Sequence, residues 1–528
     1  MESQTGGPGP LWQPRVNPWL IAISVMLATF MEVLDTSVAN VALPYIAGNL
    51  SATQDESTWV LTSYLVSNAI VLPMTGWLSS TFGRKRFLMV CVTAFTLASA
   101  ACGAAPTMGL LVFSRVLQGA AGGALQPLSQ AILMESFPPH KRGMAMAVFG
   151  LGVVVAPIIG PLLGGWITDN MSWRWIFFIT LPVGIAALLM CQTFLEDPPY
   201  LSEARARRGG KVDYLGFCFM VLWLATLQIV LDRGQEVDWF AAQWIRWFSG
   251  VSLVSMIAFV VWELRAAYPL VDLRVLRDRD FAACTAMIAV VGVVLYSAIT
   301  LLPLFLQNLM GYSAFDSGLA LSPRGIGAVI AMLLVGRLIG KVDNRLLIGG
   351  GFLLMAYSSY RFAEINLQIS IMAIVWPSVL LGLSIAMVFV PLTTQAMSNL
   401  PNERIGNAAG IFNLMRNIGG SIGISALIAV VDRGAQAHQD LLAGRIRLDS
   451  PLFHSYLQSL QAYLSRSYDP VVAKLKALGL TYDLLVQQAT LLAYMDSFRV
   501  LAYLCVLCVP AVLLLRRAQH PGRPGMGH

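Results

Sequence analysis

Stretches of about 20 mostly apolar residues recur along this chain from Trp19 nearly to Leu515, and each is long enough to cross a bilayer as a helix. Only 12% of the 528 residues are charged and 57% are apolar, whereas a soluble domain carries about 25% charged residues. Water is therefore not the main solvent of this chain, and we expect an all-α membrane protein. Breaks at charged, proline or glycine residues divide the sequence into fourteen predicted spans: 18–44, 57–79, 87–105, 108–134, 143–168, 174–194, 213–231, 243–263, 281–306, 317–340, 346–364, 369–398, 407–431 and 497–515.

The positive charges of the short loops indicate the topology. Lysine and arginine in short loops mark the cytoplasmic side of a membrane, and here they fall on alternate loops. Because an even number of spans places both termini on one side, we expect both in the cytoplasm. The basic segments are 84–86, 141–142, 205–211, 265–279, 341–345, Arg404 and 516–517.

The segment 432–496 lies on the opposite, periplasmic side in this topology and is too polar to cross a membrane. Its apolar residues repeat at helical spacing, which predicts one or two amphipathic helices. They are Leu452, Tyr456, Leu460, Tyr463 and Leu464. An apolar face outside the membrane must be covered, either by the protein's own periplasmic face or by a partner protein. The sequence favours neither cover over the other.

Several other classes of protein are excluded. The basic residues are not gathered in one patch with aromatic residues between them, which argues against nucleic-acid binding. All seven cysteines lie inside apolar runs, so we expect neither a disulfide framework nor a zinc site, and we interpret Cys505 and Cys508 as buried structural thiols. No Gly-x-x-x-x-Gly-Lys-[Ser/Thr] loop occurs, so we expect no ATP site.

Two carboxylates lie near the middle of the first span. Glu32 and Asp35 are three residues apart and share one helix face. Charges inside lipid are costly, so an acid at this depth indicates a functional site. Two carboxylates on one face can share a proton, although pairing with a cation for structural reasons is the alternative. Arg115 lies at a matching depth on the fourth span and is the predicted counter-ion.

Two further spans carry polar stripes. On the fourth span, Gln118, Gly122, Gln126 and Ser129 continue the face of Arg115, which predicts a cavity lining or a polar helix contact. On the thirteenth span, Asn413, Arg416, Asn417 and Gly420 recur at three- and four-residue steps, and substrate binding and a structural contact are equally favoured there. We expect Gln118, Gln126, Asn413, Arg416 and Asn417 to line a substrate cavity.

Small residues follow one face of the fifth span. Gly152, Ala156, Gly160 and Gly164 recur every four residues, so another helix can approach closely there. Pro157 and Pro161 interrupt the hydrogen-bond ladder beside this strip. With Gly165, these residues form the run Ala-Pro-Ile-Ile-Gly-Pro-Leu-Leu-Gly-Gly at 156–165.

That run resembles the antiporter motif of drug:proton exporters of the major facilitator superfamily. Three other segments agree: 34–44 is similar to the first-span motif of the fourteen-helix branch, the EmrB/QacA type. Arg115-Val-Leu-Gln118-Gly119 resembles the fourth-span motif tied to proton coupling, and 173–182 resembles the opening of the sixth span. The resemblance runs nearly end to end. It implies proton coupling through Asp35, Glu32 and Arg115.

The loop after the second span resembles the gating motif of the superfamily, with Gly76, Gly83 and Arg84 at the expected places. Ser80 occupies the position where an aspartate is usual. We therefore expect the charge latch of this motif to be weakened or absent.

The resemblance implies the architecture of the whole chain: two six-helix bundles around a midplane cavity, with a helical hairpin inserted between them. The predicted parts are a cytoplasmic tail (1–17), a first bundle (18–195), a basic loop (196–212), the hairpin (213–263), a cytoplasmic loop (264–280), five helices of the second bundle (281–431), the periplasmic segment (432–496), the last span (497–515) and a second tail (516–528).

The resemblance also implies the function: a proton-driven antiporter, not an enzyme, that exports lipophilic compounds across a bacterial inner membrane. It needs no cofactor and uses the proton gradient. Its implied partners are an EmrA-like periplasmic adaptor and an outer-membrane channel. The alternative is a dedicated exporter of one metabolite, such as a siderophore, a fatty acid or a peptide-like product, on the same scaffold. A membrane sensor without transport is disfavoured by the paired acids.

Overall fold

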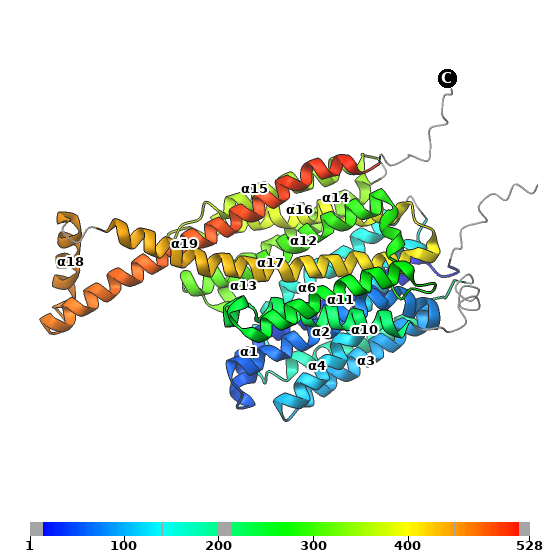
Figure 1. The fold of residues 1–528 in the computed structure, drawn as a ribbon, viewed down its shortest axis with the longest axis horizontal. Coiled ribbons are helices and arrows are strands. Elements are labelled where there is room, and N and C mark those ends of the chain that lie inside the picture. The colour runs from blue at the N-terminus through cyan, green and yellow to red at the C-terminus, as the bar shows by residue number, and fades with distance from the viewer. Residues whose placement is uncertain (1–13, 139–140, 199–212, 340, 447–449, 517–528) are drawn as a thin grey trace, which may run out of the picture.

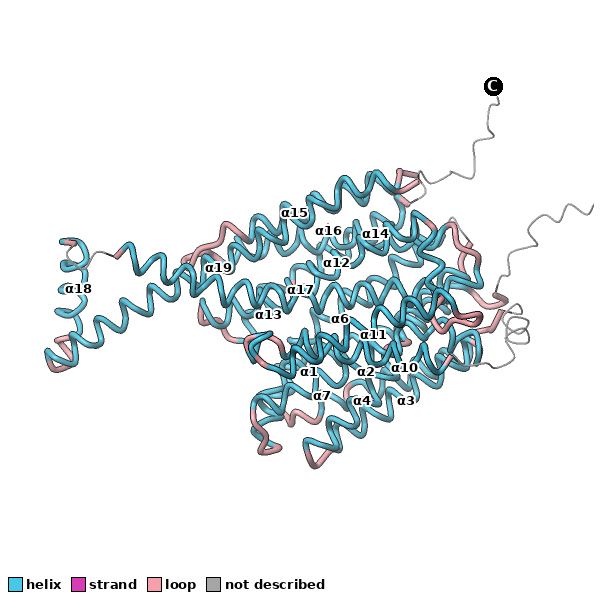
Figure 2. Tube along the Cα trace, viewed as in Figure 1, coloured by secondary structure: helices cyan, strands magenta, loops and turns pink. Residues whose placement is uncertain are grey.

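The computed structural model describes residues 14–138, 141–198, 213–339, 341–446 and 450–516. These residues form an elongated bundle of helices, and the loops gather at its two ends (Figures 1 and 2). Both described ends of the chain lie at one end of the bundle, which we call the terminal face (Figure 1). Helix α18 (Pro451–Leu464) projects at the other end, the extension face.

The first bundle comprises α1 (Pro18–Asn49), α2 (Gln54–Phe82), α3 (Arg84–Ala104), α4 (Met108–Gly122), α5 (Leu125–Ser136), α6 (Arg142–Asn170), α7 (Trp175–Phe178) and α8 (Thr180–Phe194). Helices α4 and α5 together form the fourth span, with a turn between them at Gly123. Pro127 removes a backbone donor there, so the helix cannot continue without a break. Glycine at 122 and 123 lowers the helix propensity at the same place.

The inserted hairpin consists of α10 (Tyr214–Arg233) and α11 (Gln243–Arg265). The second bundle comprises α12 (Arg279–Leu304), a π-helical turn (Phe305–Leu309), α13 (Ala314–Leu321), α14 (Pro323–Leu338), α15 (Asn344–Phe362), α16 (Ile371–Ser398), α17 (Asn402–Arg445) and α19 (Pro470–Ala511).

The prediction of an all-α membrane protein with the major facilitator architecture is confirmed. Twelve segments within the described residues are long and apolar enough to cross a membrane. Helices α2 and α15, which pack against α4 and α16, bring the number of spans to fourteen. Of the predicted loops and tails, 1–13, 199–212 and 517–528 lie outside the described residues.

The largest difference from the sequence prediction concerns the segment 432–496. We expected the thirteenth span to end at 431 and the last to begin at 497, whereas α17 continues to Arg445 and α19 begins at Pro470. Pro470 occupies the first position of α19, where proline is tolerated, and neither 432–445 nor 471–496 contains a proline or a run of glycines, so each polar segment extends a membrane helix in the same register. With α18 they form a helical extension that leaves the bundle (Figure 1).

The two bundles meet most closely toward the terminal face. A Cβ atom added to Gly76 of α2 would lie 2.6 Å from the Cα of Asn407 in α17. In the same way, a Cβ atom on Gly143 or Gly150 of α6 would lie 2.7 Å from Ile339 or Met332. Backbone approach at glycine therefore closes the bundles against each other on this side.

Candidate functional site

The Asp35 carboxylate lies at the centre of the first bundle and is 2% exposed. Its Oδ2 atom is 2.5 Å from Nη1 of Arg115, and its Oδ1 atom accepts a hydrogen bond of 2.8 Å from Gln118. Arg115 also donates to the backbone carbonyl of Val60 and to Gln118, and its guanidinium stacks 4.3 Å from the ring centre of Tyr64. Arg115 and Gln118 therefore hold Asp35 by charge-assisted hydrogen bonds in a dry setting.

Glu32 lies one helical turn away on α1 and has no cation in direct contact. Its Oε2 accepts a hydrogen bond of 2.7 Å from Gln126, and its Oε1 lies 3.4 Å from both the Tyr64 hydroxyl and the Asn68 amide. Glu32 is 5% exposed. The two acids of one helix face thus differ, since Asp35 is ion-paired and Glu32 is held by neutral donors.

Gln126 joins the two bundles. Its amide nitrogen donates to Glu32 of the first bundle, and its oxygen accepts a hydrogen bond from Nη2 of Arg416 on α17. One helical turn nearer the terminal face, Asn413 donates to Gln130 over 2.7 Å. The side chains of α5 and α17 therefore form a buried polar contact across the bundle boundary, with Glu32 at one end and Arg416 at the other.

Not every predicted cavity residue belongs to this contact. Asn417 lies next to Arg416 in sequence, but its nearest polar partner is the Tyr296 hydroxyl at 3.4 Å, on α12. Its amide therefore lies on the side of α17 that faces its own bundle. Tyr64 stacks on Arg115 and donates to Glu32, so it joins the group of Asp35, Arg115 and Gln118 to the group of Glu32, Gln126 and Arg416; Asn413, with Gln130, lies one helical turn away.

The small residues of α6 lie against α1, the helix that carries both acids. A Cβ atom on Gly160 would lie 2.5 Å from Cβ of Ser37, and one on Gly164 would lie 3.1 Å from Val38. Gly152 meets Met26 in the same way, whereas Gly165 has open space around it. Pro161 frees the carbonyl of Pro157, which accepts a hydrogen bond from the Ser37 hydroxyl.

The gating loop differs from the sequence prediction. We expected its charge latch to be weakened or absent because Ser80 replaces an acid. Arg84 instead forms a buried ion pair with Glu135 at the end of α5. The left-handed backbone of Gly83, with φ of 88°, lets the chain turn directly from α2 into α3 and places Arg84 there. The acid is supplied by another helix.

Sequence reasoning missed several residues of the site. Gln130 continues the stripe of Gln126 four residues on, so the helical spacing could have revealed it. Tyr64 and Asn68 are four residues apart on the second span and carry a similar signal. Glu135 resembled an ordinary acid at a helix end, and the sequence alone carries no signal for its pairing.

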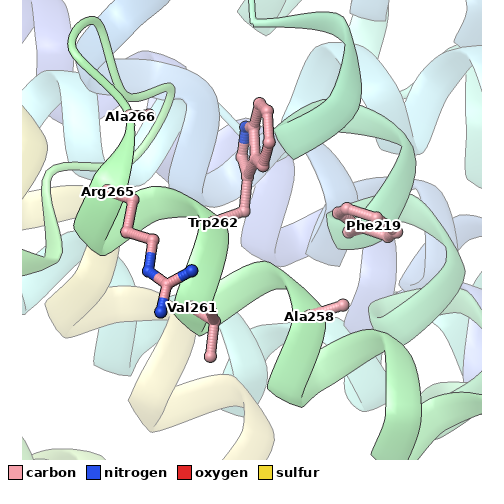
Figure 3. A pocket seen from close by; sticks show the side chains of 6 residues that line it. All are labelled: Phe219, Ala258, Val261, Trp262, Arg265 and Ala266. Atoms are coloured by element: carbon pink, nitrogen blue, oxygen red, sulfur yellow. The ribbon is translucent and has the colours of Figure 1, made fainter.

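A groove of about 210 Å³ lies on the inserted hairpin, near the terminal face. Figure 3 shows the side chains that line it, from α10, α11 and the residue after α11: Phe219, Ala258, Val261, Trp262, Arg265 and Ala266. None of the predicted site residues is among them. This groove is therefore separate from the central polar group.

Comparison with known proteins places this architecture in a family. The sequence profile of the Major Facilitator Superfamily matches residues 25–424. The chain belongs to this superfamily of membrane transporters. It is similar to the fatty acid resistance protein FarB of Neisseria gonorrhoeae, at 37% identity over 96% of this chain and 97% of that one. It is also similar to the multidrug export protein EmrB of Escherichia coli K12, at 41% identity over 77% of this chain and 78% of the relative.

The fold is also shared with superfamily members of distant sequence. The structure of the proton:xylose symporter XylE superposes with a TM-score of 0.59 at 14% identity, over 93% of this chain and 94% of the symporter. At this identity the likeness supports the fold alone. The resemblance to the EmrB type stated from the sequence motifs is confirmed by the relatives at 36–41% identity.

Proposed function

We propose that this superfamily member is a proton-driven exporter of lipophilic compounds, located in a bacterial inner membrane with its terminal face in the cytoplasm. The observation that carries the proposal is the pair of buried acids on α1, one ion-paired to Arg115 and one linked to Arg416 through Gln126. Burial of a carboxylate at mid-membrane costs free energy, so acids at this depth are retained for a function such as proton transfer. The arginines and lysines of the short loops support the orientation.

The proposed cycle couples protonation to the bundle boundary. A proton that binds Asp35 removes the negative charge facing Arg115, and a proton on Glu32 removes the one that Gln126 connects to Arg416. Since Gln126 lies across the boundary, the charge state of Glu32 changes the energy of closing the two bundles. A proton and a substrate that favour different openings of the cavity exchange with each other by linkage. The energy source is the proton gradient, and no cofactor takes part.

The breadth of substrates follows from the relatives. EmrB of Escherichia coli, which covers most of this chain, is a multidrug export protein by name, and we infer the same broad function here. The narrower alternative, export of one metabolite, is favoured by FarB, a fatty acid resistance protein by name that matches 96% of this chain. A transport assay that compares drugs with fatty acids separates the two.

We further propose that the helical extension binds a periplasmic adaptor of the EmrA type, which connects to an outer-membrane channel. Three apolar side chains of α18 are exposed: Leu452 (80%), Tyr456 (46%) and Tyr463 (68%). Phe453, Leu457, Leu460 and Leu464 are half-buried on the other face of α18, which contacts α19. The predicted stripe is thus divided, and its exposed part lacks a cover among the described residues.

The test of proton-driven export is Asp35→Asn in proteoliposomes with an imposed proton gradient. Export should fall below about a tenth of wild type, because asparagine keeps the shape of Asp35 and one acceptor oxygen but cannot titrate. Asp483→Asn, at an exposed carboxylate of α19 outside the bundle, is the matched control and should behave as wild type. If Asp35→Asn keeps more than half of wild-type export, Asp35 is structural and the proposal fails.

A further inference from the structure

Arg324 is a buried arginine that the site described above does not use. It lies in the first turn of α14 and is 6% exposed. Its Nε and Nη2 atoms are buried and make no hydrogen bond, and no carboxylate among the described residues forms an ion pair with it. A buried guanidinium without an acceptor is costly, and such groups are rare unless they have a function.

The contacts of α14 locate the Arg324 side chain. Met332 lies on the face of α14 that meets Gly150 of α6, and Gly327 lies on the face that meets Val379 of α16. At 100° per residue, Arg324 falls between these two faces and points away from Ile326, which is 61% exposed. The guanidinium therefore lies between α14, α6 and α16, at the boundary of the two bundles.

Its depth follows from the same two helices. Met332 lies level with Gly150 of α6, and Gly318 of α13 lies level with Leu162. Arg324 is between Met332 and Gly318 in sequence, so it lies beside the middle of α6. That position is well inside the membrane span and within the stretch of α6 that contains the antiporter motif.

No described carboxylate of the second bundle forms an ion pair with this cation. Three of its acids have partners of their own near helix ends: Asp280 accepts hydrogen bonds from Asn399 and the backbone of Arg516, Asp316 pairs with Ser313, and Glu364 pairs with Arg361. The other central arginine of this bundle, Arg416, already donates to Gln126. Of these two buried arginines, Arg324 is therefore the one with no acceptor among the described residues.

We propose that Arg324 binds the acidic headgroup of an amphiphilic substrate and is the residue that makes the protein select carboxylates with an apolar tail over their uncharged analogues. This inference rests on the proposed export function and specifies its substrate. A guanidinium recognises a planar carboxylate by two parallel hydrogen bonds. On α14 the same face continues with Ala328, Ala331 and Val335, so an apolar tail meets no competing polar group there. The position at the bundle boundary exposes Arg324 when the two bundles separate.

The test uses the purified full chain in phosphatidylcholine nanodiscs, without a proton gradient. Binding of dodecanoate is compared with binding of its methyl ester, which has the same tail and no charge, after subtraction of empty nanodiscs. Wild type should bind dodecanoate about tenfold more tightly than the ester. Arg324→Gln should weaken dodecanoate binding about 10- to 100-fold and leave ester binding within about twofold, the range expected for hydrogen bonds to a charged group. Arg324→Lys should lie between the two.

Arg361→Gln, at an exposed arginine of the same bundle, is the control and should change neither ligand. Equal binding of both ligands by wild type overturns the proposal, and this measurement does not depend on the folding of any variant. A loss of both ligands in Arg324→Gln also overturns it, because the residue is then structural. If anionic phospholipid in the nanodisc displaces dodecanoate while zwitterionic lipid does not, Arg324 binds a lipid headgroup, and the substrate assignment is wrong.

The outcome is independent of the proton-coupling experiment. Binding at Arg324 is measured at equilibrium, whereas Asp35→Asn is assayed by export against a gradient. If the Asp35→Asn experiment fails to support proton coupling but Arg324 still binds carboxylates selectively, this inference remains valid. Proton-driven export with no preference for carboxylates removes this inference and keeps the proposed function.

Discussion

The two bundles share one architecture but hold their charges differently. In the first, Asp35 is ion-paired to Arg115, and Glu32 is surrounded by neutral hydrogen-bond donors. In the second, Arg416 has a neutral acceptor and Arg324 has no acceptor among the described residues. The acids buried deep within the membrane span thus belong to the first bundle, and the buried arginines without a direct carboxylate partner belong to the second. Asp280 of the second bundle is also buried, but it lies in the first turn of α12.

This separation has a mechanical consequence. An ion pair inside one bundle moves with it as a rigid unit and does not resist separation of the bundles. Opposite charges on two bundles attract across the boundary, so neutralising one of them changes the energy of closure. Asp35 and Arg115 form an ion pair within one bundle. Glu32 and Arg416, joined by Gln126, carry opposite charges on two bundles. The charge of Glu32 is therefore better placed to influence the boundary than the charge of Asp35.

The bundles also differ outside the membrane. Only the second continues, among the described residues, into helices that leave the bundle, through α17 and α19. We therefore assign proton handling to the first bundle, and substrate charge recognition and partner binding to the second. Each assignment is a proposal that can be tested by a variant in one bundle that leaves the other bundle unchanged.

The largest expected effect comes from the helix contact within the first bundle. Gly160→Leu should reduce export about tenfold or more, because a leucine side chain cannot occupy a contact made by backbone approach to Ser37. Substrate binding should survive, since the second bundle is unchanged. The measurements are export in proteoliposomes and equilibrium drug binding.

Gly165→Leu is the matched control, since this glycine belongs to the same motif and has open space around it. It should retain wild-type export. If Gly160→Leu exports normally, the contact between α6 and α1 is not needed for alternation, and the division of labour between the bundles loses its support.

The next effect concerns the extension of the second bundle. Changing Leu452, Tyr456 and Tyr463 to serine should abolish co-purification with the adaptor, because burial of each side chain contributes about 1.5–3 kcal/mol of gross association energy. The variant alone should still exchange protons for substrate. The contrasting variant changes the half-buried Leu457 and Leu460 to serine. It should separate α18 from α19, because these side chains lie on the face of α18 that contacts α19. Adaptor binding that survives the triple substitution would place the docking surface elsewhere.

The sequence predicted the fold because the signals for it are local. Span length follows from hydropathy, and the depth of Asp35 and Arg115 follows from the fixed rise of a helix. The pairing partner of Arg84 could not be predicted, because it depends on how α5 is rotated against α3. Hydropathy does not specify that rotation.

Two other features were beyond the sequence for related reasons. The length of the extension was missed because a span predicted from hydropathy ends where the apolar residues end. The helical hydrogen bonding of α17 continues beyond that point. Arg324 falls inside the predicted span 317–340, so its depth could have been inferred from the sequence, but its lack of a partner could not. Its burial results from close backbone packing of α14 on α16 at Gly327 and Gly382, which no single span reveals.

The smallest effect should come from the link between the bundles, and it is measured by a double-mutant cycle. Glu32→Gln should lower export less than Asp35→Asn does and shift its pH dependence, because Asp35 still titrates. Combined with Arg416→Gln, it should show an interaction energy of about 0.5–3 kcal/mol, the range for residues in one hydrogen-bond network. The cycle of Glu32→Gln with Asn417→Leu should be additive, since Asn417 lies against Tyr296 rather than Gln126. Additivity in the Arg416 cycle, or an unchanged pH profile in Glu32→Gln, would mean that the charge of Glu32 does not reach the second bundle, and that the attraction across the boundary plays no part in closure.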